Sequence, residues 1–147
     1  MTRFSTLTLS ALVLASSATL AGDVEDAVDY RQGVMNVFSW NLEHMGAMVK
    51  GKTAFDADAF KGYAADLASA SKLDVLKGFP EDSVDDDSDA LDEIWLKWSD
   101  FEAKLQDLRD QSAKLAEVAA TGDEAAMKAQ FAEVGGACKA CHKAYKD

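Results

Sequence analysis

The stretch Cys138-Lys139-Ala140-Cys141-His142, close to the C-terminus, decides which fold we expect for this chain. Two cysteines three residues apart, with a histidine directly after the second, form the attachment signature of a c-type haem. On a helix, residues i and i+3 share a face about 5–6 Å apart, so both thiols can add to the vinyl groups of one porphyrin. His142 can then turn its imidazole to the iron as the proximal ligand. The motif predicts one covalently bound haem c per chain.

Three other chemistries can use the same cysteines. A thioredoxin-like redox pair needs a βαβ setting, and no strand-like alternation surrounds the motif. A structural zinc site needs four protein ligands, and since the chain has two cysteines and two histidines, it would need His44 as well as the motif. An exported cysteine pair can also form a disulfide in a haem-free helical bundle. The histidine directly after the second cysteine favours haem over these alternatives.

The first 21 residues have the layout of a secretory signal peptide. Arg3 supplies a positive start, residues 4–20 are rich in Leu, Ala, Val, Ser and Thr, and small residues lead to a cleavage site near Ala21. A membrane anchor is the alternative, but the run is short and rich in hydroxyl side chains for a spanning helix. We therefore expect residues 1–21 to be removed, leaving residues 22–147 as a soluble periplasmic domain without a membrane anchor.

The composition excludes several classes of function. Twenty-six acidic residues against 15 basic ones give a formal charge of −11, so the chain lacks the clustered cations that nucleic acid binding needs. This acidity supports solubility and can shape encounters with basic partners. The sequence has no glycine-rich phosphate loop and no Ser/His/Asp set for hydrolysis, so we expect a carrier and not an enzyme.

Four segments have apolar residues at the three- and four-residue spacings of amphipathic helices. They are residues 24–49, 56–74, 91–120 and 123–145. Between the second and third, residues 75–90 contain a turn at Gly78-Phe79-Pro80 and a dense acidic run, which predicts a solvated connection. The pattern predicts an all-α fold, an antiparallel up-down-up-down four-helix bundle, with haem on the fourth helix facing the first. Small residues at Gly135, Gly136 and Ala137 would let a porphyrin approach that helix closely.

Two residues of the first segment are candidates for contact with haem. Arg31 lies beside the apolar stripe, where its guanidinium could bind a haem propionate or extend along the surface to solvent. Met35, one turn later, could be the sixth iron ligand or a core side chain. All five methionines precede the haem motif, so a methionine ligand has to come from earlier in the chain.

Together these motifs resemble the class II c-type cytochromes, typified by cytochrome c′. The resemblance covers roughly residues 24–147. The segments that carry it are residues 30–35, 49–51, 55–56, Asp89 with residues 93–95, and above all Val134-Gly135-Gly136-Ala137-Cys138-Lys139-Ala140-Cys141-His142-Lys143-Ala144-Tyr145.

The resemblance implies a role for individual positions. Cys138 and Cys141 would form the thioether links and His142 the proximal iron bond. Arg31, Gln32 and Asp89 would lie at the haem edge near the propionates. Met35 would lie on the distal face. Lys146 occupies the position where many members carry a proximal arginine. Lysine keeps that charge but loses the planar fork.

The family divides at the position of Met35. In low-spin members, such as cytochromes c-556 and c-554, methionine here ligates the iron, whereas high-spin members leave it five-coordinate and bind nitric oxide or carbon monoxide. We expect a periplasmic electron-transfer protein that cycles between Fe(III) and Fe(II) and meets redox partner proteins. The alternative is a module that binds nitric oxide or carbon monoxide. Family members often pair through their first helices, so a homodimer is a further expectation.

Overall fold

The computed structural model describes residues 18–147 apart from residues 82 and 86, with side chains described from Val24 onward. In this part of the chain five α-helices and one 3-10 helix follow in order: α1 (Ala18–Val49), α2 (Ala57–Ala70), η1 (Val75–Gly78), α3 (Glu93–Leu96), α4 (Trp98–Ala119) and α5 (Glu124–Tyr145). None of the described helices is long and apolar enough to cross a membrane. Residues 1–17 of the predicted signal peptide lie outside the described residues, and α1 continues through its expected cleavage site.

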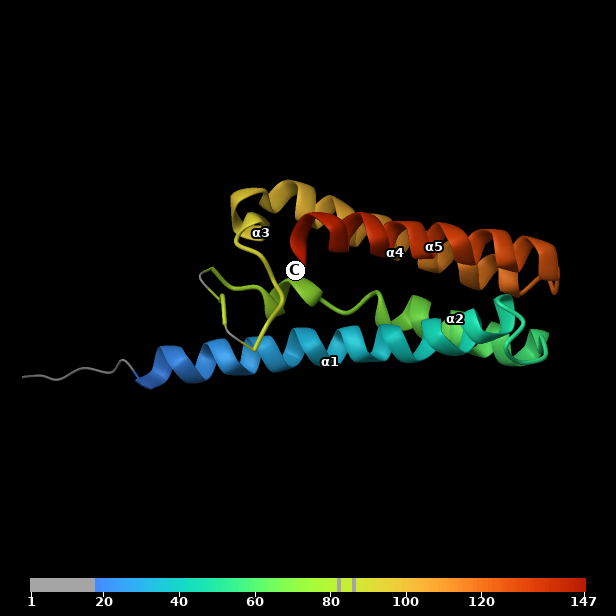
Figure 1. Ribbon diagram of the computed structural model, residues 1–147, viewed down its shortest axis with the longest axis horizontal. Coiled ribbons are helices and arrows are strands. Elements are labelled where there is room, and N and C mark those ends of the chain that lie inside the picture. Colours follow the sequence, from blue (N-terminus) through green and yellow to red (C-terminus); the bar gives the residue numbers. More distant parts are fainter. Residues whose placement is uncertain (1–17, 82, 86) are drawn as a thin grey trace, which may run out of the picture.

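The four long helices form two antiparallel hairpins, α1 with α2 and α4 with α5, which lie side by side (Figure 1). The hairpins join where α2 packs against α4. This arrangement confirms the predicted all-α four-helix bundle. The acidic segment, residues 78–92, leads from the end of η1 to α3 at the end of the bundle where the C-terminus also lies (Figure 1).

At the opposite end, local sequence signals account for both turns. Gly51 and Gly122 adopt φ values of 67° and 77° just after α1 and α4, a conformation that glycine adopts without a Cβ penalty. Asp56 accepts hydrogen bonds from the first turn of α2, and Asp123 accepts one from Ala126 N in α5. Both aspartates are N-caps, which satisfy backbone donors that have no partner within the helix.

The predicted apolar stripes form the core. The largest fully buried side chains include Met45, Phe60, Leu115 and Met127, one from each long helix. Burial of an apolar side chain of this size stabilises the fold by about 1.5–3 kcal/mol. These residues hold the two hairpins together at the end remote from the C-terminus.

The third predicted helix is divided, contrary to the continuous helix expected over residues 91–120. Lys97, at φ −129° and ψ 42°, separates α3 from α4. The break accompanies a tertiary contact, because Trp95 Nε1 donates to the backbone oxygens of Phe79 (3.3 Å) and Pro80 (2.9 Å). The second helix is also shorter than expected and ends at Ala70.

Candidate haem-binding site

The three residues of the haem motif lie on the last turns of α5. The side chains of Cys138 and Cys141 are half-buried and pack against the core, whereas His142 is exposed. Both cysteines are free thiols. The thiols therefore point into the bundle, as the predicted haem on the fourth helix facing the first requires, and the histidine lies beside them at the surface.

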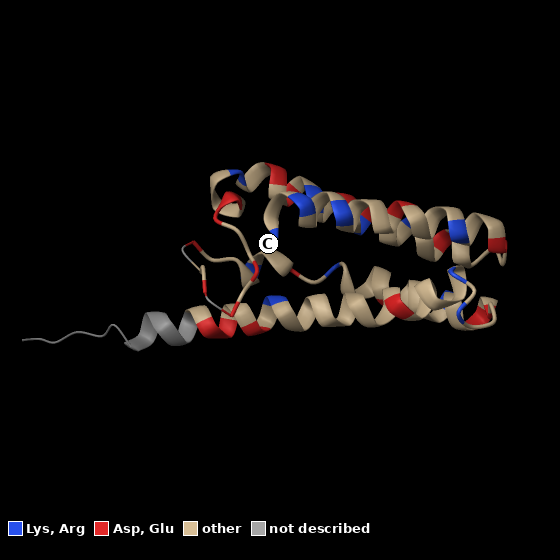
Figure 2. Ribbon diagram, viewed as in Figure 1, with Lys and Arg blue, Asp and Glu red and all other residues tan. Residues whose placement is uncertain are grey.

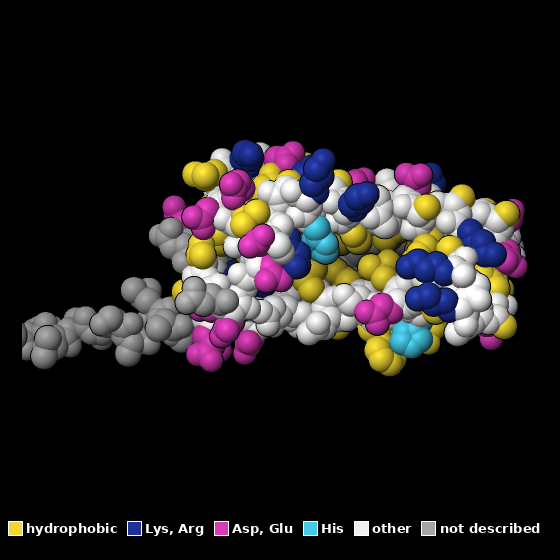
Figure 3. All heavy atoms as spheres, in the orientation of Figure 1, with side chains coloured by type: hydrophobic (Ala, Val, Ile, Leu, Met, Phe, Trp, Pro, Cys, Tyr) yellow, Lys and Arg dark blue, Asp and Glu magenta, His cyan; other side chains and the backbone are white. Residues whose placement is uncertain are grey.

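A groove of about 550 Å³ runs between α1 and α5, with Cys138 in its wall. Ser39, Leu42 and Gly46 line it from α1, and Phe131 and Gly135 line it from α5. Figure 3 shows a hollow floored by hydrophobic side chains between the two hairpins. Its volume lies within the range typical of small-molecule and cofactor sites.

The register of α1 against α5 places Met35 level with His142. Phe131 lies against Gly46, since a Cβ built on this glycine would be 3.5 Å from the phenyl ring. The two helices run antiparallel (Figure 1), and each rises about 1.5 Å per residue. His142 lies eleven positions after Phe131 on α5, and Met35 lies eleven positions before Gly46 on α1. Each residue is therefore displaced by about 16 Å along its helix, in the same direction, from the contact between Phe131 and Gly46. The predicted proximal and distal residues thus lie at one height on opposite helices.

Met35 also shares the groove face of α1. Its spacing from Ser39, Leu42 and Gly46 is four, seven and eleven residues, which is one face of a helix. The Met35 side chain is half-buried and packs against the core, whereas the nearby Phe38 side chain is buried. Met35 therefore retains an accessible surface on the side of α1 that borders the groove.

Burial shifts the pKa values of the motif residues. His142 is exposed as a residue, but partial desolvation of its imidazole lowers its pKa, and the nearby Lys146 ammonium lowers it further. The shift favours the neutral imidazole, the form that can coordinate a metal. Burial also raises the pKa values of the Cys138 and Cys141 thiols.

Arg31 is buried, with 3% of its surface exposed, so it is not the surface arginine of the second interpretation. Its guanidinium donates to Gly78 O (3.1 Å), to the hydroxyl (3.0 Å) and carbonyl (2.9 Å) of Ser83, and to the hydroxyl of Ser88 (2.6 Å). The guanidinium also lies over the Phe79 ring, 5.0 Å from its centroid. Arg31 thus fastens the acidic segment to α1.

The buried end of this segment corrects the predicted solvated connection. Ser83 is fully buried because its hydroxyl and carbonyl both accept from Arg31. Sequence reasoning missed Ser83 and Ser88, since a serine in an acidic loop has no periodicity to distinguish it.

Gln32 and Asp89 are exposed and take part in the same end of the bundle. Gln32 Nε2 donates to Asp87 O (2.7 Å). Asp89 forms an ion pair with Lys146 (2.7 Å), and its backbone oxygen accepts from Asp147 N (3.0 Å). Hydrogen bonding from Lys146 lowers the pKa of the Asp89 carboxyl, as does its charge. The acidic segment is thereby linked to both α1 and the C-terminal tail.

Aromatic side chains continue from the motif turn of α5 into the bundle. Tyr145 packs edge-on against Phe101, with ring centroids 5.4 Å apart, and its hydroxyl donates to Asp100 Oδ2 (2.6 Å). Desolvation and this hydrogen bond raise the pKa of Tyr145 to about 12. Phe101 in turn contacts Phe79 (4.8 Å) and Trp98 (5.8 Å). Only the apolar spacing of Phe101 and Tyr145 was readable from the sequence, and the Tyr145–Asp100 pair was not.

Two features of this site suit a haem. A Cβ built on Gly135 or Gly136 would meet nothing within 4 Å, so open space lies beside the α5 backbone next to Cys138. Among the described residues, the buried Nε atom of Arg31 has no hydrogen-bond partner, which leaves a cationic donor for an anionic group. A flat apolar ring with carboxylate substituents matches both features.

Comparison with known proteins agrees with this geometry. The sequence profile of the family described as Cytochrome C′ matches residues 26–146. The chain belongs to the cytochrome c′ family. A cytochrome c′ from Halomonas halodenitrificans is 35% identical over 128 residues, covering 83% of this chain and 96% of the relative. A cytochrome c-554 from Cereibacter sphaeroides is 30% identical and covers 95% and 93% of the two chains.

Solved structures of cytochromes c′ share the fold. The structure from Shewanella frigidimarina superposes with a TM-score of 0.81 at 39% identity, covering 84% of this chain and 96% of that one. A nitric oxide complex of a variant cytochrome c′ from Alcaligenes xylosoxidans has a TM-score of 0.76 at 35% identity, with 84% and 95% coverage. The cofactor of this family is haem c, and the two cysteines needed to attach it are those of the motif.

Proposed function

We propose that this protein carries electrons in the bacterial periplasm by means of its haem c. Cys138 and Cys141 hold the ring covalently, and His142 is the proximal iron ligand. Met35 lies on the distal side, and the haem edge meets Arg31, Gln32 and Asp89. Haem c bound by these residues would supply one-electron chemistry between the ferric and ferrous states of its iron. The protein acts as a carrier and catalyses no turnover of its own.

The observation that carries this proposal is the equal height of His142 and Met35 on facing helices. A ring attached to the inward thiols of α5 would lie between α1 and α5, because Cys138 lines the groove between these helices. Burial and axial ligation control the reduction potential of a haem. The neutral state favoured for His142 keeps a lone pair ready for the metal.

The residues around the ring have separate tasks. Arg31 holds the acidic segment through its Nη atoms and keeps Nε for an acceptor. A propionate is such an acceptor, and charge-assisted pairs of this kind are among the stronger hydrogen bonds. The apolar residues of the groove, such as Leu42 and Phe131, would limit the access of water to the ring.

The optical spectrum tests this function, recorded on the exported protein in both redox states and with carbon monoxide. A split α/β pair in the reduced form with no response to carbon monoxide is expected if Met35 ligates the iron. Met35→Leu should then give a high-spin spectrum that responds to carbon monoxide. Met45→Leu, a change within the buried core, should leave the spectrum unchanged. Absence of haem absorbance from a host able to attach haem contradicts the proposal.

A second candidate function is reversible binding of nitric oxide or carbon monoxide at a five-coordinate iron. It is favoured by the nitric oxide complex of the Alcaligenes xylosoxidans relative. The half-buried Met35 also leaves the distal side less filled than a core residue would. A broad high-spin spectrum that shifts with carbon monoxide in the unmodified protein supports this function over ligation by Met35.

Export and self-association complete the proposal. Mass spectrometry of the periplasmic protein should show removal of residues 1–21.

For a homodimer, α1 offers Val37 and Trp40, with 45% and 61% of their surfaces exposed. Light scattering should report a dimer that Trp40→Glu converts to a monomer, whereas a monomeric wild type contradicts pairing.

A further inference from the structure

We propose that the aromatic pocket beside η1 and α3 is the docking face for the redox partner, and that this partner presents a lysine-rich rim. The aromatic pocket consists of Leu76, Phe79, Pro80, Glu81, Trp95 and Trp98 and encloses about 450 Å³. The inference rests on the proposed electron-transfer function, which it extends by naming the surface and the chemistry of the partner.

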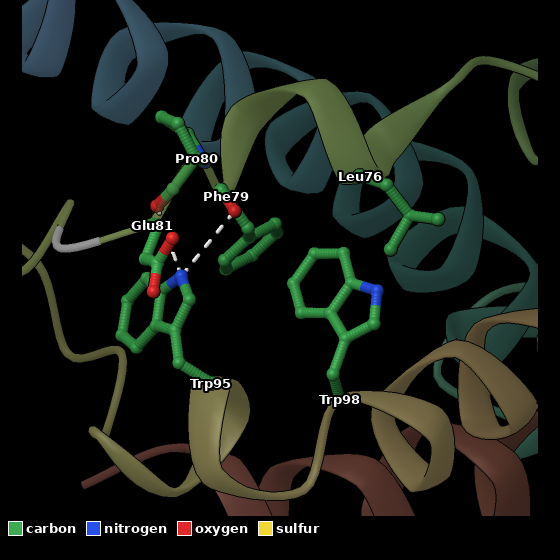
Figure 4. Close-up of a pocket in the computed structure, with 6 residues that line it drawn as sticks. All are labelled: Leu76, Phe79, Pro80, Glu81, Trp95 and Trp98. Carbon is green, nitrogen blue, oxygen red and sulfur yellow. Dashed lines mark hydrogen bonds between the residues drawn. The ribbon is translucent and has the colours of Figure 1, made fainter.

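The aromatic pocket has rigid walls. Figure 4 shows Leu76 and Phe79 on one side and the indole rings of Trp95 and Trp98 on the other. Trp95 is held in place by its hydrogen bonds to the backbone oxygens of Phe79 and Pro80. Trp and Tyr are enriched among the residues that dominate binding at protein interfaces. A rigid aromatic wall therefore offers area for contact at a small cost in side-chain entropy.

Two exposed apolar residues lie close to the lining residues of the aromatic pocket in the sequence. Leu96, next to Trp95, has 80% of its surface exposed, and Val84, in the acidic segment, has 49%. Leu96 has the largest exposed fraction among the exposed large hydrophobic residues of the described chain. Exposed apolar residues beside a rimmed pocket are typical of an interaction site.

The charge around the aromatic pocket identifies the partner. Between Lys77 and Lys97 the sequence has eight acidic residues and no basic one. Glu81 lines the aromatic pocket itself, and Asp87 and Asp92 nearby in the chain are exposed. Figure 2 shows acidic residues at this end of the bundle, in the first part of α1, the acidic segment and α3, whereas acidic and basic residues are interspersed along α4 and α5. Such a concentration of one charge favours encounter with a surface of the opposite charge.

The aromatic pocket also contacts the haem motif through neighbouring side chains. Trp98 and Phe79 both pack against Phe101, and Phe101 packs against Tyr145. Tyr145 follows His142 by less than one turn of α5. A partner seated on the aromatic pocket is therefore separated from the haem-bearing turn by a short row of packed rings.

The charge distribution favours a basic protein over a second copy of this chain. Two copies meeting at this face would bring two acidic segments together, which is unfavourable. Electron-transfer encounters are small, transient and guided by complementary charge. A small aromatic pocket with a charged rim therefore suits a transient encounter better than a permanent interface.

The experiment measures electron transfer from the reduced haem protein to oxidised horse heart cytochrome c, a purified basic probe. One electron leaves the ferrous haem of this protein and reduces the ferric haem of the probe. The test variant, called the acidic-segment variant, is Glu81→Lys/Asp87→Lys/Asp92→Lys. The matched control is Asp66→Lys/Glu117→Lys/Glu133→Lys, which makes the same change in net charge at exposed positions on α2, α4 and α5. A small neutral mediator replaces the probe in parallel.

At about 10 mM salt we expect the acidic-segment variant to transfer electrons to the probe about tenfold more slowly than wild type. The control should lose less than about threefold, and all rates should converge at about 0.5 M salt, where surface charges are screened. Leu96→Ser should slow the reaction about threefold even at high salt, since the apolar contact is not screened.

Equal losses in the two triple variants overturn the inference, because net charge alone would then govern the encounter. A dimer of the wild type that Leu96→Ser dissociates overturns it as well, since the face would bind a second copy. Transfer to the neutral mediator separates the two proposals. If the mediator is reduced but the variants do not differ, only the docking face is wrong. If neither acceptor is reduced, the electron-transfer function itself is wrong.

Discussion

The two ends of the bundle are held together by different kinds of contact. At the end remote from the C-terminus, the turns after α1 and α4 follow local rules, with a positive-φ glycine near each turn and an aspartate N-cap on the next helix. Fully buried apolar side chains from all four long helices fill the space between. The glycine turns and the aspartate caps each depend on a few neighbouring residues, and the apolar stripe of each helix depends on spacing within that helix.

At the end that bears the haem motif, polar contacts between distant parts of the chain add to the packing of apolar side chains. Arg31 reaches residues 47 to 57 positions away, and Tyr145 reaches Asp100 across 45 positions. The acidic segment, α3 and the C-terminal tail are all held this way. One end therefore depends on apolar packing and local caps, whereas the other combines apolar packing with a polar network beside the haem motif.

The difference shows how one small bundle combines stability with a site. Apolar packing at the remote end can hold the helices together whether or not a ring is bound. The polar network at the motif end positions the acidic segment, the C-terminal tail and the Arg31 guanidinium beside the haem motif. Variants at the two ends should accordingly change different properties.

The largest effect is expected from removing the haem attachment. Cys138→Ser/Cys141→Ser should abolish covalently bound haem, because no thiol remains to add to a vinyl group. Haem staining after denaturing electrophoresis measures this loss. His44→Gln serves as the control, since His44 stacks on Trp40 and Tyr63 away from the motif, and it should retain full staining. Retained covalent haem in the double variant would show that the motif has been misread.

Next in size is a cavity at the remote end. Leu115→Ala should lower the free energy of unfolding by about 2–5 kcal/mol, since Leu115 is fully buried and the structure can relax only partly. Urea titration of the holoprotein measures this change. The haem spectrum of the folded fraction should be unaltered, because Leu115 belongs to the packing end. A changed spectrum would mean that the two ends are not separable.

Arg31→Leu should act mainly on the motif end. It removes four hydrogen bonds to the acidic segment and leaves buried acceptors such as Ser83 without a donor, at a cost of about 1–3 kcal/mol. Hydrogen exchange should show faster opening of residues 78–90, with little change around the turn between α1 and α2. Arg109→Leu is the matched control, because Arg109 binds the backbone oxygens of Ser71 and Leu73 instead. Equal opening of both regions would contradict the division into two ends.

The smallest effect is expected at high pH. The folded state raises the pKa of Tyr145 to about 12, above the usual value of about 10. The resulting stabilisation is complete below pH 10 and is lost as the pH rises toward 12, because the unfolded chain ionises its tyrosine from pH 10 whereas the folded state resists forming a phenolate beside Asp100. Urea midpoints between pH 9 and 11.5 should therefore fall more for wild type than for Tyr145→Phe. Tyr63→Phe retains this pair and should follow the wild-type curve.

Periodicity identified the bundle and most of its core correctly. Phe101, Leu105, Leu108 and Leu115 are buried as their spacing predicts. The predicted boundaries were less exact at the motif end, where the third helix is broken at Lys97 and the second stops at Ala70. Both errors occur where a tertiary contact, such as Trp95 to the Phe79 and Pro80 carbonyls, overrides local propensity.

The haem motif, the bundle and the thiols facing inward follow from the sequence by itself, because each depends on the spacing of residues within one helix. The partners of Arg31, the burial of Ser83 and the level position of Met35 and His142 come only from the tertiary structure. These features join residues from different helices, and their distances depend on how the helices are placed against one another. A helical period determines which face of a helix is apolar, whereas the register between two helices is decided by contacts such as that of Phe131 with Gly46.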